Sequence, residues 1–405
     1  MRRRLCILTQ FWPPEIGAPQ GRLSELGECL IDRGWAVEAL TALPNYPTGH
    51  IFAGYNPLRI RVEQIGRIRT VRVPMWPANH GIVKRLVSHL TFVAAASYHG
   101  PRFVTRPDLL LVESPPLFIL YAAWRLAGHW RCPYVLNVSD LWPESAVRIG
   151  AVSHTHPGVR FAERLERRGY ERAAGVTAQS DGIVQGVLAR APKTKTCIIT
   201  NGVDASRFAD GAADIAAKKL LGEDPGPIFV FAGLFGLAQG LDQVLDVAKR
   251  LPTDLPGRFV LIGDGPVRER LAMRIRDEQI ARVRLLAAQP RERIPGILAH
   301  ADAAIVTLGM NIPGAVPSKI YEAMAAALPI VIVAHGEPRE RVLHAKCGIG
   351  VAPGDLRALE EAVTRLIRDP DMRHELGRNG RRAAETVYDR SRIAAALADF
   401  LESIT

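Results

Sequence analysis

Two charged side chains stand near the start of an otherwise largely apolar stretch, VPSKIYEAMAAALPI at residues 316–330. Lys319 carries an ammonium, which suits a phosphate, and Glu322 follows three residues later. If the stretch is helical, the unpaired backbone N–H groups of its first turn add partial positive charge beside Lys319. The Glu322 carboxylate could accept two hydrogen bonds from a ribose diol. These residue types at this spacing predict a site for a nucleoside diphosphate.

A helix is predicted over residues 317–328 of this stretch. Pro317 and Ser318 are typical of a helix start, and Pro329 ends the pattern. The apolar remainder would pack on a sheet. The two charges also allow a plainer interpretation, because a Lys–Glu pair three residues apart on a helix surface contributes only about 0.2–0.5 kcal/mol and binds no ligand. The residues alone leave both interpretations open.

Two glycine-rich loops could bring backbone close to a ligand. FWPPEIGAPQGR at 11–22 follows the first predicted strand, and AGLFGLAQGLD at 232–242 follows a later one. Each loop opens a helix at the carboxyl end of a strand, which is where ligands of open α/β sheets bind. A glycine turn between a strand and a helix is usually only a turn, so each loop alone is a weak signal.

These candidate groups lie where short apolar strands give way to helices. That alternation predicts an α/β fold with parallel sheets covered on both faces. Strands are predicted at 5–10, 36–41, 109–112, 134–138, 197–200, 228–232, 258–262, 282–286, 303–307, 330–333 and 349–351. Helices are predicted at 22–33, 160–173, 240–250, 266–278, 317–328, 356–368 and 372–385.

The alternation falls into two arrays, which predicts two doubly wound, Rossmann-like domains facing a cleft. The N-terminal domain is expected over residues 1–200 and the C-terminal domain over 201–385. The Gly-, Asp- and Ala-rich segment TNGVDASRFADGAAD at 200–214 is the predicted linker. A last helix, 386–405, is expected to pack back across the first domain.

The composition excludes several classes of protein. Hydrophobic residues make up 48% of the 405 residues, which is too many for a disordered chain. No apolar run approaches the roughly 20 residues of a membrane span, and the start lacks the features of a signal peptide. The five cysteines are widely spaced with no CxxC, as expected for reduced residues of a cytoplasmic protein. The one Asp-x-Asp, at 369–371, is expected to cap a helix, so no metal site is predicted.

The net charge of +11 belongs entirely to the N-terminal half. Residues 1–200 hold 25 Lys and Arg against 14 Asp and Glu, whereas residues 201–405 hold 27 of each. No nucleic-acid fold signature and no basic stripe with interleaved aromatics is present, so no nucleic acid is expected. An anionic membrane surface would explain the charge, and so would a solvated basic surface without a partner. The segment 80–103, with Lys84 and Arg85 at its start, could be an amphipathic helix on lipid or an ordinary packed helix.

Several motifs carry a resemblance to a known family. The second half resembles the donor domain of family 4 glycosyltransferases with the GT-B fold, through NGVD (201–204), AGLFGLAQGLDQVL (232–245), LIGDGP (261–266), VPSKIYEAMAAALPIV (316–331) and CGIGVAPGD (347–355). The first half resembles bacterial transferases of O-antigen and capsule synthesis, including N-acetyl-L-fucosaminyltransferases, through PPEIGAPQGRL (13–23), LTALPNYPTGHIFAGY (40–55), ESPPL (113–117) and LNVSDLWPESAVRIGA (136–151).

The resemblance implies a donor site that departs from the family's pattern. Glu322 matches the second Glu of the family's Glu-x7-Glu pair and is expected to bind the donor ribose. The first Glu falls at Gly314, so that carboxylate is missing. Leu234 and Gln239 stand where the family often has an Arg and a Lys for the phosphates. Lys319 is therefore expected to be the principal cation for the diphosphate.

Further residues are assigned by the same resemblance. Arg22 is expected to reach the phosphates from the first domain, and Gly17 to approach them when the cleft closes. The remaining residues expected to line the donor are Gly233, Phe235, Gly236, Gly263, Gln289, Pro317 and Ser318.

Asp140 matches a position at a strand end that faces the cleft, where it would orient the acceptor hydroxyl and act in catalysis with Lys319 and Glu322. The alternative is that Asp140 caps the following turn. Glu113 is a weaker candidate near the same rim.

The reaction implied is a retaining, metal-independent transfer of a sugar from a UDP-sugar to a polyprenyl-diphosphate-linked saccharide, without a cofactor. An N-acetylated deoxyhexosamine is one sugar that the resemblance suggests. The enzyme would be cytoplasmic and associated with the anionic inner face of the cell membrane. Two alternatives remain, a GT-B sugar-nucleotide epimerase and a non-catalytic sugar-nucleotide-binding partner of an assembly complex, the second motivated by the departures at positions 314, 234 and 239.

Overall fold

The structure is a computed structural model that describes residues 2–15, 17–78, 81–209, 211, 214–222 and 225–404. The chain divides into two compact units. Unit 1 comprises residues 1–200 and 390–405, and unit 2 comprises residues 201–389. Part of the predicted linker at 200–214 lies outside the described residues.

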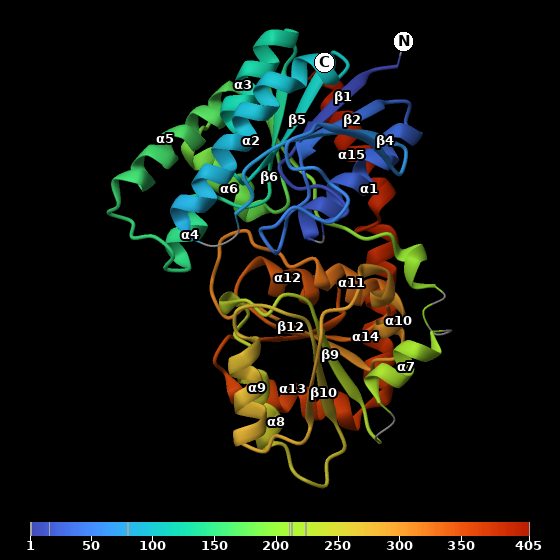
Figure 1. Cartoon of the computed structure of the whole chain (residues 1–405). Helices are drawn as coiled ribbons and strands as arrows, with labels where there is room; N and C mark the ends of the chain where they lie inside the picture. Colours follow the sequence, from blue (N-terminus) through green and yellow to red (C-terminus); the bar gives the residue numbers. More distant parts are fainter. Residues whose placement is uncertain are drawn as a thin grey trace. The chain divides into compact units, whose positions relative to one another are not determined.

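Unit 1 is built on an eight-stranded sheet in the order β3-β4-β2-β1-β5-β6-β7-β8 (Figure 1). All neighbouring strands pair in parallel except β3, which runs antiparallel to β4. The carboxyl ends of the parallel strands therefore meet at one edge of the sheet. The strands are β1 Arg4–Leu8, β2 Ala36–Ala42, β3 Arg61–Ile65, β4 Ile68–Val73, β5 Leu109–Ser114, β6 Tyr134–Val138, β7 Gly175–Ala178 and β8 Thr196–Ile198.

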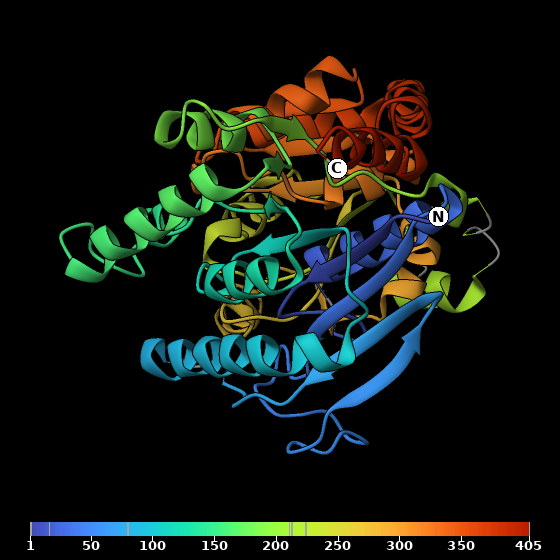
Figure 2. The ribbon, with the colours of Figure 1, turned by 90° about the horizontal axis from the view of Figure 1, so that it is seen from above.

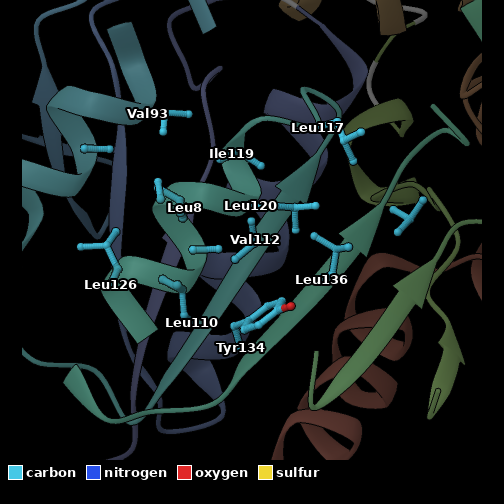
Figure 3. Close-up of a cluster of buried hydrophobic side chains, with 14 of the residues drawn as sticks. Leu8, Val93, Leu110, Val112, Leu117, Ile119, Leu120, Leu126, Tyr134 and Leu136 are labelled. Carbon is cyan, nitrogen blue, oxygen red and sulfur yellow. The ribbon is translucent and has the colours of Figure 1, made fainter. Parts of the chain in front are cut away.

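Helices cover both faces of this sheet. Alternate residues of β1 show why: Cys6 and Leu8 join one buried cluster, while Leu5 and Ile7 join another on the opposite face. Figure 3 shows part of the first cluster, in which Val93 and Leu120 pack with residues of β5 and β6. The helices of unit 1 are α1 Ala18–Asp32, α2 Ile82–Phe103, α3 Ile119–Trp130, α4 Glu144–Arg148, α5 Pro157–Arg172, α6 Asp181–Arg190 and α15 Arg390–Glu402.

Two pairs of helices in unit 1 pack against each other. The C-terminal helix α15 lies beside α1 and shares its buried cluster, so the chain returns to unit 1 at its end (Figure 1). Arg390 of α15 forms an ion pair with Glu25 of α1 at 3.0 Å. On the other face, α2 and α3 lie side by side (Figure 2).

Unit 2 repeats the same principle with a fully parallel, six-stranded sheet in the order β11-β10-β9-β12-β13-β14. Alternate residues again point to opposite faces, since Phe229 and Phe231 join one core cluster and Val230 joins the other. The strands are β9 Ile228–Ala232, β10 Arg258–Ile262, β11 Val283–Leu286, β12 Ala303–Thr307, β13 Ile330–Val333 and β14 Gly348–Val351. The helices are α7 Ile215–Leu221, α8 Asp242–Arg250, α9 Arg268–Asp277, α10 Ile294–Ala299, α11 Lys319–Ala325, α12 Glu337–His344, α13 Leu356–Arg368 and α14 Pro370–Thr386.

The predicted fold of two doubly wound, Rossmann-like sheets is confirmed, but some boundaries differ. The helix predicted over 386–405 begins only at Arg390, and the residues just before it belong to unit 2. The helix predicted over 317–328 is shorter, because α11 spans only Lys319–Ala325 and Ala327 takes a left-handed φ of 55°. Cys6 and Cys347 are buried, whereas the other three cysteines are only partly buried. Across the described residues, every helix is either too short or too polar to cross a membrane.

Candidate active site

In unit 2, three loops at the carboxyl edge of the sheet pack backbone against backbone. The loop after β9 donates from Gly233 N to Ile262 O at 2.8 Å and from Phe235 N to Asp264 O at 2.8 Å. A Cβ added at Gly263 would lie 1.9 Å from the Gly233 carbonyl oxygen, so only glycine fits there. Gly309, after β12, donates to Ala238 O at 2.8 Å. The loop that bears the glycine motif is therefore held by the ends of two neighbouring strands.

Lys319 reaches this glycine loop from the start of α11. Its ammonium lies over the Phe231 ring, 3.8 Å from the centroid. A Cβ added at Gly233, whose φ is +142°, would meet the Lys319 side chain at 2.3 Å. Burial lowers the pKa of Lys319 to about 7, and Glu322 opposes that effect. The ammonium therefore packs on an aromatic face, and Glu322 lies close enough to act on it electrostatically.

This arrangement suits an anion. A half-buried ammonium is costly unless a negative group joins it, and the closely packed glycine loop leaves backbone exposed beside it. Ser318 and Pro317 precede Lys319 at the same end of α11, and Glu322 follows within its first turn. Because α11 has only seven residues, its dipole adds less than the longer predicted helix would have.

Phe235 and Gln289 are further predicted donor residues, and Leu234, Gln239 and Gly314 are the positions that depart from the family pattern. Phe235 is fully buried in the core, so its side chain cannot touch a ligand and only its backbone remains available. Gln289, after β11, is half-buried, donates to Ala287 O at 3.2 Å and accepts from Arg293 at 3.2 Å. Leu234 is 56% exposed at the tip of the glycine loop, where the family often has a cation. Gln239 has a buried Oε1 without a partner in the described ranges. Gly314 takes a left-handed φ of 72°.

In unit 1, Gly17 stands immediately before α1, at the carboxyl edge of the sheet. The Gln20 side chain folds back over it, since a Cβ added at Gly17 would lie 2.2 Å from Gln20 Oε1. Because Gln20 Oε1 is the end of a flexible side chain and the φ of 179° is extended, neither space nor backbone angle alone requires glycine at position 17.

Arg22 lies in a buried polar network that the sequence pattern did not predict. It contacts Glu113 at 3.2 Å and donates to Ser139 Oγ at 2.7 Å, and both charged side chains are only 3% exposed. Asn137 and Ser139 also donate to Glu113, and Thr177 donates to Asn137 at 2.8 Å. The phosphate contact predicted for Arg22 stays a prediction, and Glu113, which was expected near the rim, is buried. Polar residues at the ends of two consecutive buried strands, in LNVS and VTAQ, were the available signal.

The network supports the loop that carries Asp140. Gln179 donates to Ser139 O at 3.0 Å, so the residue before Asp140 is fixed through both its backbone and its side chain. Burial raises the pKa of Asp140 to about 6, with Ser145 and the Leu141 backbone opposing it. A carboxyl group with this pKa is largely ionised at neutral pH and can accept a hydrogen bond from a hydroxyl. Asp140 lies shortly after the end of β6. Its two predicted roles, orienting the acceptor hydroxyl and capping the following turn, both stay predictions.

Two Rossmann-like units with parallel sheets in one chain are the architecture of the GT-B fold. Residues 17–202 match the family model described as glycosyl transferase 4-like domain, and residues 213–383 match the one described as glycosyl transferases group 1. Both halves of the chain therefore match glycosyltransferase models, and the chain is a glycosyltransferase of the GT-B type.

Curated relatives and solved structures agree with this assignment. A putative colanic acid biosynthesis glycosyl transferase, WcaI of Escherichia coli K12, is 26% identical over 334 residues, which are 80% of this chain and 81% of that protein. The sucrose-phosphate synthase of Thermosynechococcus elongatus superposes with a TM-score of 0.78 at 20% identity over 100% and 99% of the two chains. Anabaena HepE in complex with UDP-glucose superposes with a TM-score of 0.72 at 18% identity over 99% of each chain. The two structural likenesses show the fold.

Proposed function

We propose that this enzyme transfers a sugar from a UDP-sugar to a polyprenyl-diphosphate-linked saccharide in the synthesis of a surface polysaccharide. The observation that carries the proposal is the half-buried Lys319 ammonium, held on Phe231 beside the glycine loop of unit 2. It is a cation placed beside exposed backbone at the carboxyl edge of a parallel sheet, where a nucleoside diphosphate would be bound.

Unit 2 would hold the donor. Lys319 neutralises the diphosphate as it leaves, so no metal ion is needed for that charge. Glu322 accepts hydrogen bonds from the ribose hydroxyls. Gly233, Gly236 and Gly263 allow backbone to approach the phosphates. Leu234 and Gln239 lack the positive charges that the family often has there, and Gly314 lacks its carboxylate. Lys319 therefore supplies a larger share of the positive charge beside the diphosphate than its counterpart in the family.

Unit 1 would hold the acceptor, with Asp140 orienting the attacking hydroxyl. In a retaining transfer the acceptor oxygen bonds to the anomeric carbon on the face from which the diphosphate departs. The bond from the anomeric carbon to the phosphate oxygen breaks, and that oxygen takes the proton of the acceptor hydroxyl. The protein then supplies positioning and electrostatic stabilisation, and Arg22 and Glu113 act by holding the Asp140 loop.

The substrate class rests on the relatives and on the motifs of the first half. HepE, a protein of the same fold, has been seen with UDP-glucose, and WcaI is named for colanic acid biosynthesis. The resemblance of unit 1 to O-antigen and capsule transferases favours a lipid-linked acceptor, and an N-acetylated deoxyhexosamine is the donor sugar that we would test first.

A membrane surface is the proposed location, through the exposed side of α2. Four of its large apolar side chains, spaced on one helical stripe, are exposed: Val83, Val87, Leu90 and Tyr98. Phe92, Val93 and Ala96 on the opposite side pack in the core, so the helix is anchored while its apolar stripe faces outward. Lys84 and Arg85 lie exposed in the first turn of α2, and Arg102 stacks over Tyr98 at 4.3 Å. An apolar stripe with basic flanks fits an anionic lipid surface at the inner face of the membrane.

The direct test is transfer by the purified enzyme in the presence of anionic vesicles. Radiolabelled UDP-sugars, each supplied with a polyprenyl-diphosphate-linked acceptor, should yield labelled lipid and free UDP. The proposal expects no product from donor alone, which separates it from an epimerase. Binding of UDP without transfer to any lipid-linked acceptor would overturn the acceptor assignment, and conversion of the donor sugar without acceptor would overturn the reaction.

A further inference from the structure

Glu15 is a buried carboxylate whose hydrogen-bond partners are backbone groups of two separate loops. It lies in the loop after β1 and is only 4% exposed. Its Oε2 accepts from Trp12 N at 3.0 Å in its own loop. Its Oε1 accepts from Asn45 N and from Tyr46 N, each at 2.8 Å, in the loop after β2. One side chain therefore satisfies three backbone donors that no strand or helix pairs.

The two loops that Glu15 joins are the ones that leave β1 and β2 at the carboxyl edge of the sheet. Further contacts join them. Phe11 and Tyr46 meet edge to face, with ring centroids 5.6 Å apart. Arg72, near the end of β4, donates to the carbonyl of Pro13 in the first loop and to that of Ala42, the last residue of β2. The Glu15 carboxylate is thus the centre of a small buried assembly.

We infer that Glu15 is a positioning residue, which holds residues 11–15 and the loop 43–49 as one body and so fixes the segment that precedes Gly17 on the acceptor face of unit 1. This inference rests on the proposed function, because Gly17 would contact the donor diphosphate and unit 1 would hold the acceptor. Glu15 touches neither substrate in this account. It acts through the backbone of the residues around it.

Only a carboxylate can accept hydrogen bonds from all three backbone N–H groups. Both of its oxygens accept, whereas the carboxamide of Gln has one oxygen and one NH2 group that can only donate. In Glu15→Gln, either the Trp12 N–H or the pair from Asn45 and Tyr46 would face a donor. A buried donor without an acceptor destabilises its local conformation, so one of the two loops must move. Burial raises the pKa of Glu15, and its three N–H donors and Arg72 oppose this by favouring the ionised form.

The matched control is Glu28→Gln. Glu28 of α1 also joins two segments, since it accepts from Arg67 N at 2.7 Å and from the Arg67 side chain at 2.6 Å. Arg67 lies in the turn between β3 and β4, at the opposite end of β4 from Arg72. The same chemical change is thus made in unit 1, away from the carboxyl edge.

The test combines hydrogen exchange with kinetics on the full-length enzyme. In Glu15→Gln, amides in peptides covering 11–17 and 43–49 should exchange at least tenfold faster, while the rest of unit 1 is unchanged. The kcat of transfer should fall about ten- to a hundredfold, the scale of a misplacement near 1 Å. The UDP-induced rise in Tm should largely persist, because the contacts proposed for Lys319 and Glu322 of unit 2 are unchanged and only the contact proposed for Gly17 is affected. Glu28→Gln should change neither these peptides nor kcat.

The exchange and kinetic results together test the positioning role of Glu15. Faster exchange with unchanged kcat would make Glu15 merely structural, and lower kcat with unchanged exchange would refute the loop mechanism. Failure of the wild-type enzyme to transfer sugar would instead refute the proposed function, and the exchange data would still test the loop assembly. If Glu15→Gln does not fold, the wild-type enzyme supplies the test, since rapid exchange of the Asn45 and Tyr46 amides would overturn the inference.

Discussion

Replacing Lys319 with Met is expected to make the enzyme more stable and less able to bind UDP. Burial lowers the pKa of Lys319 from 10.5 to about 7, a difference of about 3.5. At about 1.36 kcal/mol for each unit of pKa, keeping the charge costs up to about 5 kcal/mol at neutral pH. The contact with Phe231 offsets about 0.5–2 kcal/mol of this. Met keeps the apolar packing, so a net gain of about 1–3 kcal/mol is expected after allowing for the partial exposure of the side chain.

The pH dependence follows from the direction of the pKa change. Because the folded pKa is lowered, the unfolded chain binds the extra proton between about pH 7 and 10.5, and the wild type gains stability as the pH rises through that window. The advantage of Lys319→Met is therefore full at pH 7 and shrinks towards pH 10. A gain of 1–3 kcal/mol corresponds to roughly 2–12 °C in Tm for a unit of this size.

Binding should change in the opposite direction. Loss of a charged hydrogen-bonding partner for the diphosphate weakens UDP binding by about 1.5–3 kcal/mol, or roughly ten- to a hundredfold in Kd. Calorimetry and thermal unfolding at pH 7 and pH 9 would measure both effects. Lys249→Met is the control, since Lys249 forms an exposed pair with Glu278 at 3.3 Å. A Lys319→Met variant that unfolds at a lower temperature at pH 7 and binds UDP as well as the wild type would refute the reasoning.

Three further predictions concern the other parts of the site. Glu322→Ala should weaken UDP binding by about 1.5–3 kcal/mol, measured by calorimetry, because a carboxylate for the ribose is lost. Asp140→Asn should lower kcat without changing the Kd of UDP, and wild-type kcat should fall as the pH drops through about 6, because burial raises the pKa of Asp140 to that value and its ionised form is the active one. Leu90→Glu should reduce sedimentation with anionic vesicles at low salt at least tenfold, because it places a charge on the exposed apolar stripe of α2.

Each of these predictions has a contrary result. Unchanged UDP affinity in a folded Glu322→Ala enzyme would remove Glu322 from the donor site. If kcat of the Asp140→Asn enzyme still falls as the pH drops through about 6, another group causes that pH dependence. If the wild-type enzyme ignores anionic vesicles at low salt, or Leu90→Glu binds them equally well, α2 is not the lipid-binding surface.

The sequence was most informative where the pattern is local and apolar. Buried strands such as those at 228–232 and 258–262 were placed residue for residue, because short apolar runs between helices leave few other interpretations. β3 and β4 were missed, because RVEQI and IRTVRV carry several charges and β3 is an antiparallel edge strand. β7 was missed because its sequence, GVTA, holds only one large apolar residue and begins with glycine.

The candidate site was predictable in its positions but not in its contacts. Lys319 and Glu322 stand out in the sequence because they interrupt an apolar run. The stacking of Lys319 on Phe231 could not be predicted, since 88 residues separate them along the chain. Arg22 was assigned to phosphate by the family resemblance, and its buried contacts with Glu113 and Ser139 could not be predicted because they depend on strands far along the chain.

Thermal unfolding with UDP, GDP and ADP tests the central claim most directly. Ligand binding to the native state raises its stability by RT ln(1 + [L]/Kd), which is about 3–4 kcal/mol at several-hundredfold excess. A rise in Tm is expected with UDP that is larger than with GDP or ADP, and it should be clearly smaller in Glu322→Ala and Lys319→Met because their UDP binding is weaker. An equal or larger rise with GDP would contradict the assigned donor, and no rise with any of the three would contradict the donor site itself.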